Sequence, residues 1–435
     1  MARTRGVNAF IFVAVAVASL LVTAAAPARA SGSTSPASVS SGGAASNGYS
    51  AYPSTSGDGL LVAFTSAASN LSARDQHDNF DVFVRDRRAG RTIFASPSRL
   101  GGTSNGHSIE SSLADDGSAV AFSSDASDLV SGDFNGVSDV FVRDLVAVRT
   151  ERVPDASSEP NGPSGWPSVS GDGRYVAYES AASNLVPHDG NGATDVFIYD
   201  RLTKATERIS VTSSGGEADG WSIRPAISPD ARYVAFTSIA PDLVEGDTNG
   251  EADVFLRDRL HGTTEIISVS SSETPAVGGW SIDADVSDGG RFVAFTSEAA
   301  NLAPGDSGSR TDVFVRDRVL GTTTLASRTT RGSSGNGYSG HPSISADGSA
   351  VAFDSTASDL VVADVNGRSD VFVYDAASAS IALVSRGAGD LPGTDHSLAP
   401  SLSGDGTSVA FASDAATLVV PDLNAARDVF VRDLA

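Results

Sequence analysis

The sequence predicts an all-β protein made of seven copies of one unit. The tripeptide Asp-Val-Phe occurs seven times, at intervals of 58, 56, 58, 59, 58 and 58 residues. The three- to four-residue spacing of apolar side chains that marks a helix is absent from these units. A chain that repeats at this period buries its core one unit at a time, in a ring or a stack. The repeats are centred on Asp81, Asp139, Asp195, Asp253, Asp312, Asp370 and Asp428.

Each unit is expected to form four short antiparallel strands. In the fourth unit, β-rich runs at Pro225–Ser228, Tyr233–Ser238, Asp253–Asp258 and Thr264–Val269 are separated by turn residues. Seven such sheets arranged around one axis bury both faces of every sheet. We therefore predict a seven-bladed β-propeller of four-stranded antiparallel blades.

The two ends of the chain are predicted to meet in one blade. The last unit stops directly after its third strand, so this blade needs a fourth strand to cover its edge. The segment 31–45 contains Ala37–Gly43, which is similar to Ile209–Gly216, the fourth strand of the third unit and its following loop. We expect this N-terminal strand to complete the C-terminal blade and to close the ring.

Residues 1–30 are predicted to be a secretory signal peptide. Arg3 and Arg5 precede an apolar run from Ala9 to Ala26, and Ala28-Arg29-Ala30 offers a cleavage site between small residues. An uncleaved anchor is the alternative. The mature chain, 31–435, is expected to be a single propeller domain without a membrane span, secreted to the extracellular space, or periplasmic in a bacterium with two membranes.

The composition restricts the chemistry. The chain contains no cysteine, so disulfides, thiolate ligands and a lipid-modified cysteine are excluded. Its formal charge is −23, and removal of the three arginines of the signal peptide makes it −26. Such a charge disfavours binding to nucleic acid or anionic membranes and could attract divalent cations or basic partners, although it also serves solubility alone. We expect a monomer.

Several acidic residues recur in nearly every unit and are interpreted as structural. Asp-Gly pairs such as Asp58-Gly59 lie between the first two strands, where a hairpin turn needs a positive φ. The aspartate that closes the third strand, for example Asp86 or Asp258, is expected to cap the next turn. A single active site does not need seven copies of one residue.

The units resemble the WD-like repeats of TolB-type propellers. The pattern Ser-x-Asp-Gly-x-x-Val-Ala-Phe followed by Asp-Val-Phe-Val-x-Asp is seen, with small changes, in Ser170–Phe197 and Ser345–Phe372. The resemblance covers nearly the whole mature chain and implies the propeller fold. Because that family includes binding modules, scaffold proteins and the propeller parts of larger enzymes, it implies no single function. The chain departs from TolB in the absence of an additional N-terminal domain and in a much longer loop between the second and third strands.

The loop between the second and third strands carries the pattern Asp-x-Asn-Gly-x-x-Asp or a weaker form of it. Alternating oxygen-bearing side chains beside a glycine turn are typical of calcium loops, because hard cations prefer oxygen ligands. The alternative is that Asn-Gly makes the turn and the aspartates bond loop amides without a metal. We predict a possible calcium site most strongly for the four full copies, which are Asp133, Asn135 and Asp139; Asp189, Asn191 and Asp195; Asp247, Asn249 and Asp253; and Asp364, Asn366 and Asp370.

The loop that leads into each first strand is expected to lie on the same face as the aspartate-rich loops. It carries a repeated ring-bearing side chain that could stack on sugars or grip a peptide around the channel mouth. The alternative is that each ring wedges between neighbouring blades. These residues are Tyr49, His107, Trp221, Trp280, Tyr338 and His396, with Pro163 in the third unit.

One position does not repeat, although its neighbours do. A packing site would keep one residue type in every blade, whereas a site that contacts a ligand is free to vary. We expect these side chains to converge on the central channel, as ligand contacts or as a solvated rim. They are Tyr52, Glu110, Trp166, Arg224, Asp283, His341 and Ala399.

The leading functional hypothesis is a secreted, non-catalytic binding or scaffold module that meets a glycan or an extracellular or envelope protein on its long-loop face. The alternative is a polysaccharide lyase or hydrolase at the channel mouth, with Glu110 and His341, or Asp283 and Arg224, as its acid and base. A third hypothesis is a structural protein stiffened by calcium.

Overall fold

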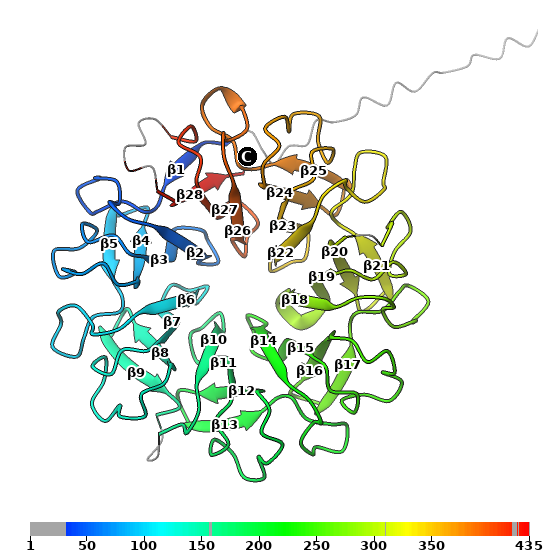
Figure 1. Ribbon diagram of the computed structural model, residues 1–435, viewed down its shortest axis with the longest axis horizontal. Helices are drawn as coiled ribbons and strands as arrows, with labels where there is room; N and C mark the ends of the chain where they lie inside the picture. Colours follow the sequence, from blue (N-terminus) through cyan, green and yellow to red (C-terminus); the bar gives the residue numbers. More distant parts are fainter. Residues whose placement is uncertain (1–31, 156–158, 309, 420–423, 425, 435) are drawn as a thin grey trace, which may run out of the picture.

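The computed structural model describes residues 32–155, 159–308, 310–419, 424 and 426–434. The predicted signal peptide and Asp422 of the last loop lie outside the described residues. The described chain forms seven four-stranded antiparallel sheets around a central opening, as Figure 1 shows. This confirms the predicted seven-bladed β-propeller. Two short 3₁₀ turns accompany the strands, η1 (Asp288–Gly290) and η2 (Ala388–Asp390). Within the described ranges, no helix has the length and apolar character needed to cross a membrane.

Each blade runs from an inner strand beside the central opening to an outer strand at the rim (Figure 1). The inner strands are β2 (Ser50–Thr55), β6 (Ser108–Leu113), β10 (Ser164–Val169), β14 (Ser222–Ile227), β18 (Ser281–Val286), β22 (Ser339–Ile344) and β26 (Ser397–Leu402). The second strands are β3 (Leu61–Ser66), β7 (Ala119–Ser124), β11 (Tyr175–Ser180), β15 (Tyr233–Ser238), β19 (Phe292–Ser297), β23 (Ala350–Ser355) and β27 (Ser408–Ser413).

The third strands begin at the recurring Asp-Val-Phe, and the outer strands are shorter. The third strands are β4 (Asp81–Asp86), β8 (Asp139–Asp144), β12 (Asp195–Asp200), β16 (Asp253–Asp258), β20 (Asp312–Asp317), β24 (Asp370–Asp375) and β28 (Asp428–Asp433). The outer strands are β5 (Arg91–Phe94), β9 (Arg149–Val153), β13 (Ala205–Arg208), β17 (Thr263–Ile266), β21 (Thr322–Leu325), β25 (Ser380–Leu383) and, for the last blade, β1 (Thr34–Pro36).

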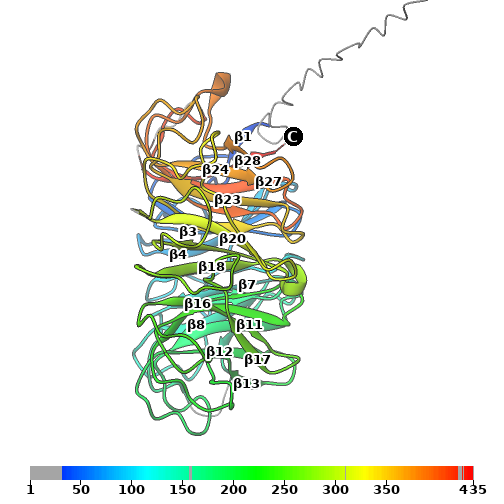
Figure 2. The same ribbon diagram turned by 90° about the vertical axis from the view of Figure 1, so that its right-hand side faces the viewer.

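The core consists of layers between neighbouring blades, which stand side by side in the edge-on view of Figure 2. The second and third strands supply it, because their alternating Val, Ala and Phe side chains are buried on both faces of the sheet. In the fifth blade Phe295 and Phe314 stack with their ring centroids 5.7 Å apart, and both are fully buried. The same aromatic pair recurs in every blade.

The N-terminal strand closes the ring, as the sequence predicts. β1 pairs antiparallel with β28, with Thr34 opposite Arg432 and Pro36 opposite Phe430. Ser38 then donates to the Asp428 carboxylate at 2.6 Å, which matches the bond from Ser210 to Asp195 in the third blade. The paired strand is shorter than the predicted segment 31–45, although the backbone amides of Ala37 and Ser38 still donate to the Val429 carbonyl of β28.

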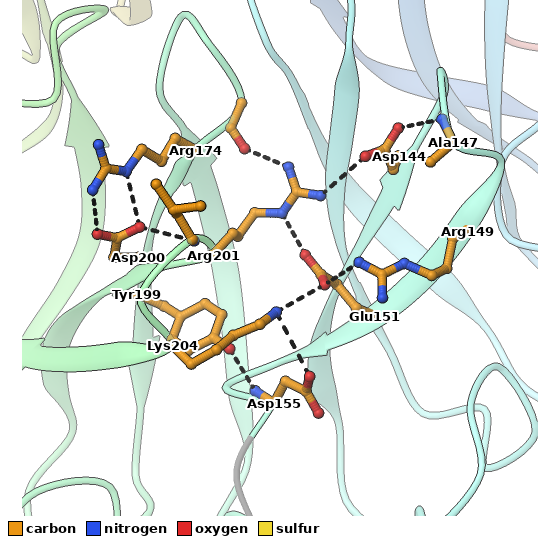
Figure 3. Close-up of polar contacts among 12 residues, drawn as sticks. Asp144, Ala147, Arg149, Glu151, Asp155, Arg174, Tyr199, Asp200, Arg201 and Lys204 are labelled. Carbon is orange, nitrogen blue, oxygen red and sulfur yellow. Dashed lines mark hydrogen bonds and ion pairs between the residues drawn. The ribbon is translucent and has the colours of Figure 1, made fainter.

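Charged residues join neighbouring blades near the rim, and Figure 3 shows the junction of the second and third blades. Glu151 of β9 is 6 % exposed and accepts hydrogen bonds from Arg201, at 2.5 Å, Lys204 and Arg149, both at 3.1 Å. Arg201 also donates to the Gly173 carbonyl of its own blade. One buried carboxylate therefore fixes the rim of two blades.

Candidate functional site

The inner strand of every blade contains a β-bulge. Its register with the second strand shifts two residues after its start, for example between Ala51 and Ser54 in the first blade. In all seven blades the bulge residue has a left-handed backbone conformation, although none of the seven is glycine. This conformation costs an L-residue about 1 kcal/mol or more. The bulge residues are Tyr52, Glu110, Trp166, Arg224, Asp283, His341 and Ala399, with φ between 48° and 57°.

The bulges turn these seven side chains into one cavity at the end of the central channel. The cavity has a volume of about 310 Å³ and is lined by the bulge residues together with the residue that follows each of them. That following residue is proline in five blades, Pro53, Pro167, Pro225, Pro342 and Pro400, and its ring fixes the backbone beyond the bulge. The predicted convergence of the non-repeating positions is thus seen in the structure.

One side of the cavity is a connected network of charged and aromatic groups. The Arg224 guanidinium lies 4.9 Å from the centre of the Trp166 ring and forms an ion pair with Asp283. The Arg224 backbone amide donates to Glu179 at 2.8 Å. Burial raises the pKa of Glu179, with a smaller contribution in the same direction from Glu110. Asp283 and Arg224, which the sequence offered as a candidate acid–base pair, are thus joined by an ion pair.

His341 occupies the next place around the ring. Its Nδ1 lies 3.0 Å from the Asp354 carboxylate, which also accepts the Ala399 backbone amide at 2.8 Å. The hydrogen bond to Asp354 raises the pKa of His341, and burial opposes this effect. His341 is the one histidine in the described lining of this cavity, and Asp354 supports it from outside the lining.

Glu110 is held differently from His341. Its carboxylate accepts the Ser123 hydroxyl at 2.8 Å and the Trp166 backbone amide at 3.1 Å. Glu110 and His341 belong to the second and sixth blades and line the same cavity, with separate partners. Both hydrogen bonds are made to the same carboxylate oxygen, so the second oxygen is the one available to a ligand.

The remaining side of the cavity is formed by Ala399 and Tyr52 and has fewer polar contacts. The small alanine leaves room beside Tyr52, which is 48 % exposed. Trp166 is 40 % exposed on the other side of Glu110. Two half-exposed aromatic side chains therefore flank one carboxylate at the mouth of the channel.

The repeated ring-bearing residues lie outside the cavity lining and contact the neighbouring blade. The imidazoles of His107 and His396 accept the backbone amides of Phe80 and Ser369, in each case at 3.0 Å. The Arg427 guanidinium of the last blade lies 5.4 Å from the centre of the Tyr49 ring and donates to the Tyr49 hydroxyl at 3.0 Å. These contacts agree with the wedge between blades that the sequence left open.

Trp280 and Tyr338 are among the ring-bearing residues that remain open to solvent on the long-loop face. Trp280 is 51 % exposed and Tyr338 is 60 % exposed. The Trp221 ring stands edge-on to Trp280, with 6.4 Å between centroids. This pair is a second aromatic surface, separate from the cavity.

In the aspartate-rich loops the asparagine makes a turn. Asn249 Oδ1 accepts the Glu251 backbone amide at 2.8 Å, and its Nδ2 donates to Asp253 at 2.6 Å and to the Ala276 carbonyl at 3.1 Å. Asn135 and Asn366 make the same three contacts in their blades. Asn191 accepts the Ala193 amide and donates to the Ala218 carbonyl. The asparagine oxygen is thus already engaged, which leaves the carboxylates as the candidate metal ligands of each loop.

In the third blade three carboxylates gather around an arginine. Asp189, Asp195 and Glu217 bring one oxygen each within 4.8 Å of one another, an arrangement that could hold a metal ion. The Arg208 guanidinium lies 3.0 Å from Glu217, 3.5 Å from Asp189 and 3.9 Å from Asp195. A positive charge of the chain itself therefore already lies among these carboxylates.

The opposite end of the channel is held by a ring of serine hydroxyls. In five junctions a serine of one inner strand accepts a backbone amide of the next, as Ser343 does from Leu402 at 3.0 Å. Ala226 stands in the serine position of the fourth blade. Asp285 of the fifth blade compensates, because it accepts both the Val286 and the Ile344 amides, at 2.9 and 2.8 Å.

Sequence reasoning missed Glu179, Asp354, Asp285, Arg152 and Arg208, although a signal for each exists. Each of them stands where most other blades have a different residue type. Glu179 and Asp354 replace Thr or Ser, Asp285 replaces Ser, and Arg152 and Arg208 replace an apolar residue. A comparison of the seven units at every position of the repeat identifies these residues in the same way as the cavity residues.

No protein-family model matches the chain, and no curated protein matches it either. Among solved structures, an oligogalacturonate lyase in complex with manganese has a TM-score of 0.55 at 13 % identity, covering 93 % of this chain and 98 % of the lyase. The β-propeller domain of the Trilobed protease from Pyrococcus furiosus has a TM-score of 0.54 at 14 % identity, covering 89 % and 93 %. These similarities show the fold.

TolB from Acinetobacter baumannii is also among the similar structures. Its TM-score is 0.41 at 16 % identity, and the match covers 77 % of this chain and 62 % of TolB. The chain therefore spans less than two thirds of that protein. TolB-type propellers are among the proteins that this chain resembles in structure, as they are in the pattern of its repeats.

Proposed function

We propose that this protein is a secreted, monomeric binding module whose channel-mouth cavity holds a short segment of a glycan. The observation that carries the proposal is the set of seven bulge residues. Glycine is the residue of lowest cost in a left-handed conformation, yet every blade keeps a side chain there, and all seven side chains differ. Side chains retained at such positions and directed into one cavity indicate recognition.

The chemistry of the cavity favours a sugar. Tyr52 and Trp166 offer half-exposed aromatic faces on which the apolar face of a pyranose can stack. Glu110, Asp283 and His341 supply hydrogen-bonding groups for hydroxyls. The volume of about 310 Å³ lies at the lower end of the range for small-ligand sites, so the cavity suits one or two sugar units. An extracellular or envelope protein bound on the long-loop face is the alternative partner.

The experiment is a binding screen of the 31–435 chain against cell-wall and plant polysaccharides by calorimetry, with and without calcium. We expect Tyr52→Ala or Trp166→Ala to weaken binding by at least about fivefold, because stacking on an aromatic side chain contributes roughly 1–3 kcal/mol. Trp280→Ala is the matched control, since Trp280 is exposed and lies outside the cavity; Trp221→Ala tests its neighbour in the same way. Equal losses in the cavity variants and in these controls, or no glycan bound at all, would contradict the proposal.

The competing function is a polysaccharide lyase or hydrolase at the same cavity. Its candidate acid and base groups are present there, although Arg224 is paired with Asp283 and His341 with Asp354. The same panel distinguishes the two functions. Release of new reducing or unsaturated ends that is lost in Glu110→Ala or His341→Ala identifies an enzyme, whereas binding without product supports the module.

A further inference from the structure

The aspartate-rich loops of six blades each bring two buried or half-buried carboxylates together. One comes from the start of the loop and the other from the start of the third strand, and the two carboxylates are close enough to interact electrostatically in every case. Two like charges in a place of low dielectric require a positive charge beside them or a shared proton. The pairs are Asp75 and Asp81, Asp133 and Asp139, Asp189 and Asp195, Asp247 and Asp253, Asp306 and Asp312, and Asp364 and Asp370.

In the second and third blades the positive charge is an arginine of the outer strand. Arg152 Nη1 lies 3.9 Å from both Asp133 and Asp139. Arg208 makes the equivalent approaches, at 3.5 and 3.9 Å, to the pair in the next blade. Each arginine is supported by an additional glutamate, Glu159 or Glu217, at 2.7 and 3.0 Å. These two blades show where a cation stands relative to the paired carboxylates.

The sixth and fourth blades have the same loop without the arginine. Register pairing places Leu383 opposite Phe372, where the third blade places Arg208 opposite Phe197. Ile266 takes this place in the fourth blade, opposite Phe255. In the sixth and fourth blades the positive charge that the second and third blades carry is therefore replaced by an apolar side chain. The first and fifth blades also have an apolar residue there, Phe94 and Leu325, but their loop aspartates accept the His77 and Gly308 backbone amides, at 3.2 and 2.8 Å.

The sixth blade shows the consequence for the carboxylate. Asp364 is 5 % exposed, and both of its carboxylate oxygens are buried without a hydrogen-bond partner of standard geometry. Asp370 receives the Ser385 hydroxyl at 2.5 Å and the Asn366 amide at 2.6 Å. A buried carboxylate whose oxygens lack a hydrogen-bond partner of standard geometry points to a missing cation.

We propose that the loop of the sixth blade, and its counterpart in the fourth, binds a divalent oxygen-preferring cation in the place that the guanidinium occupies in the second and third blades. The ligands are Asp364 and Asp370 in the sixth blade, and Asp247 and Asp253 in the fourth. Calcium fits best, because both groups are carboxylates on loops and calcium accepts flexible oxygen coordination completed by water or carbonyls. The asparagine orients the second aspartate and is a positioning residue.

This inference narrows the four calcium sites predicted from the full sequence motif to two, and it is independent of glycan binding. The four full motifs are alike in sequence, so the motif itself does not divide them. The four loops differ in the outer-strand residue that pairs with the Phe of the third strand. An arginine there supplies the positive charge, whereas an apolar residue leaves room for an ion. Where the ion binds, it fixes a loop on the same face as the channel mouth.

The experiment is calcium titration of the chelator-treated 31–435 chain by calorimetry, together with melting curves in calcium and in magnesium. We expect close to two sites per chain, with dissociation constants of about 10⁻⁴ to 10⁻³ M, as in other extracellular calcium modules. We also expect the melting temperature to rise by at least about 2 °C at about 10 mM calcium. Asp364→Asn is expected to remove one site and about half of the rise.

Two further variants isolate the role of the arginine. Leu383→Arg introduces the charge of the third blade into the sixth and is expected to remove the same site as Asp364→Asn. Asp189→Asn, in the arginine-containing third blade, is expected to leave the number of sites unchanged. If Leu383→Arg does not fold, the comparison of Asp364→Asn with Asp189→Asn decides the question.

The proposal is overturned if calcium up to about 10 mM produces neither binding heat nor a change in melting temperature. It is also overturned if Asp364→Asn and Asp189→Asn bind as many ions as the unaltered chain, or if both lose one. Failure of the glycan screen has no bearing on any of these outcomes, because neither aspartate lines the channel cavity.

Discussion

The channel wall and the contacts between blades follow opposite rules. At the channel wall, one position carries seven different side chains, all held in a backbone conformation that disfavours them. Away from the channel, the same aromatic pair packs against the neighbouring blade, and the same Ser–Asp bond ties the third strand to the end of the outer strand within a blade. Residues that hold blades together are constrained by packing that is identical at every junction, whereas the channel residues are not. The difference separates architecture from recognition within a single chain.

The largest effect is expected from the repeated aromatic pair. Phe314→Ala removes a fully buried ring that stacks on Phe295 between two blades, and the cavity left behind cannot collapse easily. We expect a loss of about 3–5 kcal/mol in the free energy of unfolding, measured by denaturant titration of the 31–435 chain. Trp280→Ala removes a larger but half-exposed ring and serves as the control, with an expected loss below about 1 kcal/mol. Similar losses in both variants would mean that the repeated pair is not what holds the blades together.

The next largest effect is expected at the junction shown in Figure 3. Glu151→Gln leaves Arg201 and Lys204 facing a neutral group in a buried place, and we expect it to cost about 2–4 kcal/mol. Glu265→Gln, at an ion pair whose glutamate is 48 % exposed, is the matched control and should cost less than about 1 kcal/mol.

The same junction predicts a pH dependence of known sign. Burial raises the pKa of Glu151, but the hydrogen bonds and charges of Arg201 and Lys204 outweigh burial and lower it overall. Because the folded pKa lies below the unfolded one, the stabilisation is present at neutral pH and is lost as the pH falls through the folded pKa. The difference in stability between the unaltered chain and Glu151→Gln should therefore shrink towards acid pH. A difference that is constant from pH 7 to pH 3 would argue against a charge effect.

A smaller effect tests the exception in the serine ring. Asp285→Ser restores the residue type of most other blades but removes the acceptor of the Val286 amide, because Ala226 supplies none. We expect a loss of about 1–2 kcal/mol, with recovery in the double variant Ala226→Ser, Asp285→Ser. An absence of recovery would show that the carboxylate does more than replace the missing hydroxyl.

Asp285 also predicts a pH dependence opposite to that of Glu151. Burial raises the pKa of Asp285 to about 6, with hydrogen bonds from Ile344 and Val286 opposing the shift. A raised folded pKa means that the folded state takes up the proton first, so the contribution of this group is most favourable at low pH and is lost as the pH rises through about 6. Unfolding curves at pH 5 and pH 7.5 should show that the unfolding free energy of the unaltered chain, relative to that of the double variant, is higher at pH 5 than at pH 7.5.

The repeat allowed much of the fold to be predicted, and its irregularities explain what was missed. The second and third strands of the fourth unit, Tyr233–Ser238 and Asp253–Asp258, match the predicted runs residue for residue. The first strand of that unit starts at Ser222, three residues before the predicted run, because the bulge at Arg224 interrupts the alternation that marks a strand. The closing strand and the cavity residues were also identified from the sequence.

What the sequence did not reveal are contacts across paired strands that no motif encodes. From the sequence, Arg208 would be taken for a solvent-exposed arginine of an outer strand. Its place among three carboxylates follows only from the register of β12 with β13. Asp354 likewise supports a histidine whose inner strand pairs with its own. Distances across a sheet are set by strand pairing, so these sites need the structure.

The smallest effect, and the one with the opposite sign, is expected at the channel wall. Ala399→Gly relieves the strain of a left-handed alanine, whose φ is 50°, and the methyl group it removes makes no hydrogen bond or ion pair. We expect a gain of about 0.5–1 kcal/mol in unfolding free energy, since the relief of strain exceeds the extra freedom of glycine in the unfolded chain. Ala410→Gly, at a buried position of β27 in the same blade, is the control and should lose at least about 1 kcal/mol, because it adds chain freedom and opens a cavity. If Ala399→Gly also loses stability, the bulge conformation carries no cost, and the argument that side chains are retained there for recognition fails with it.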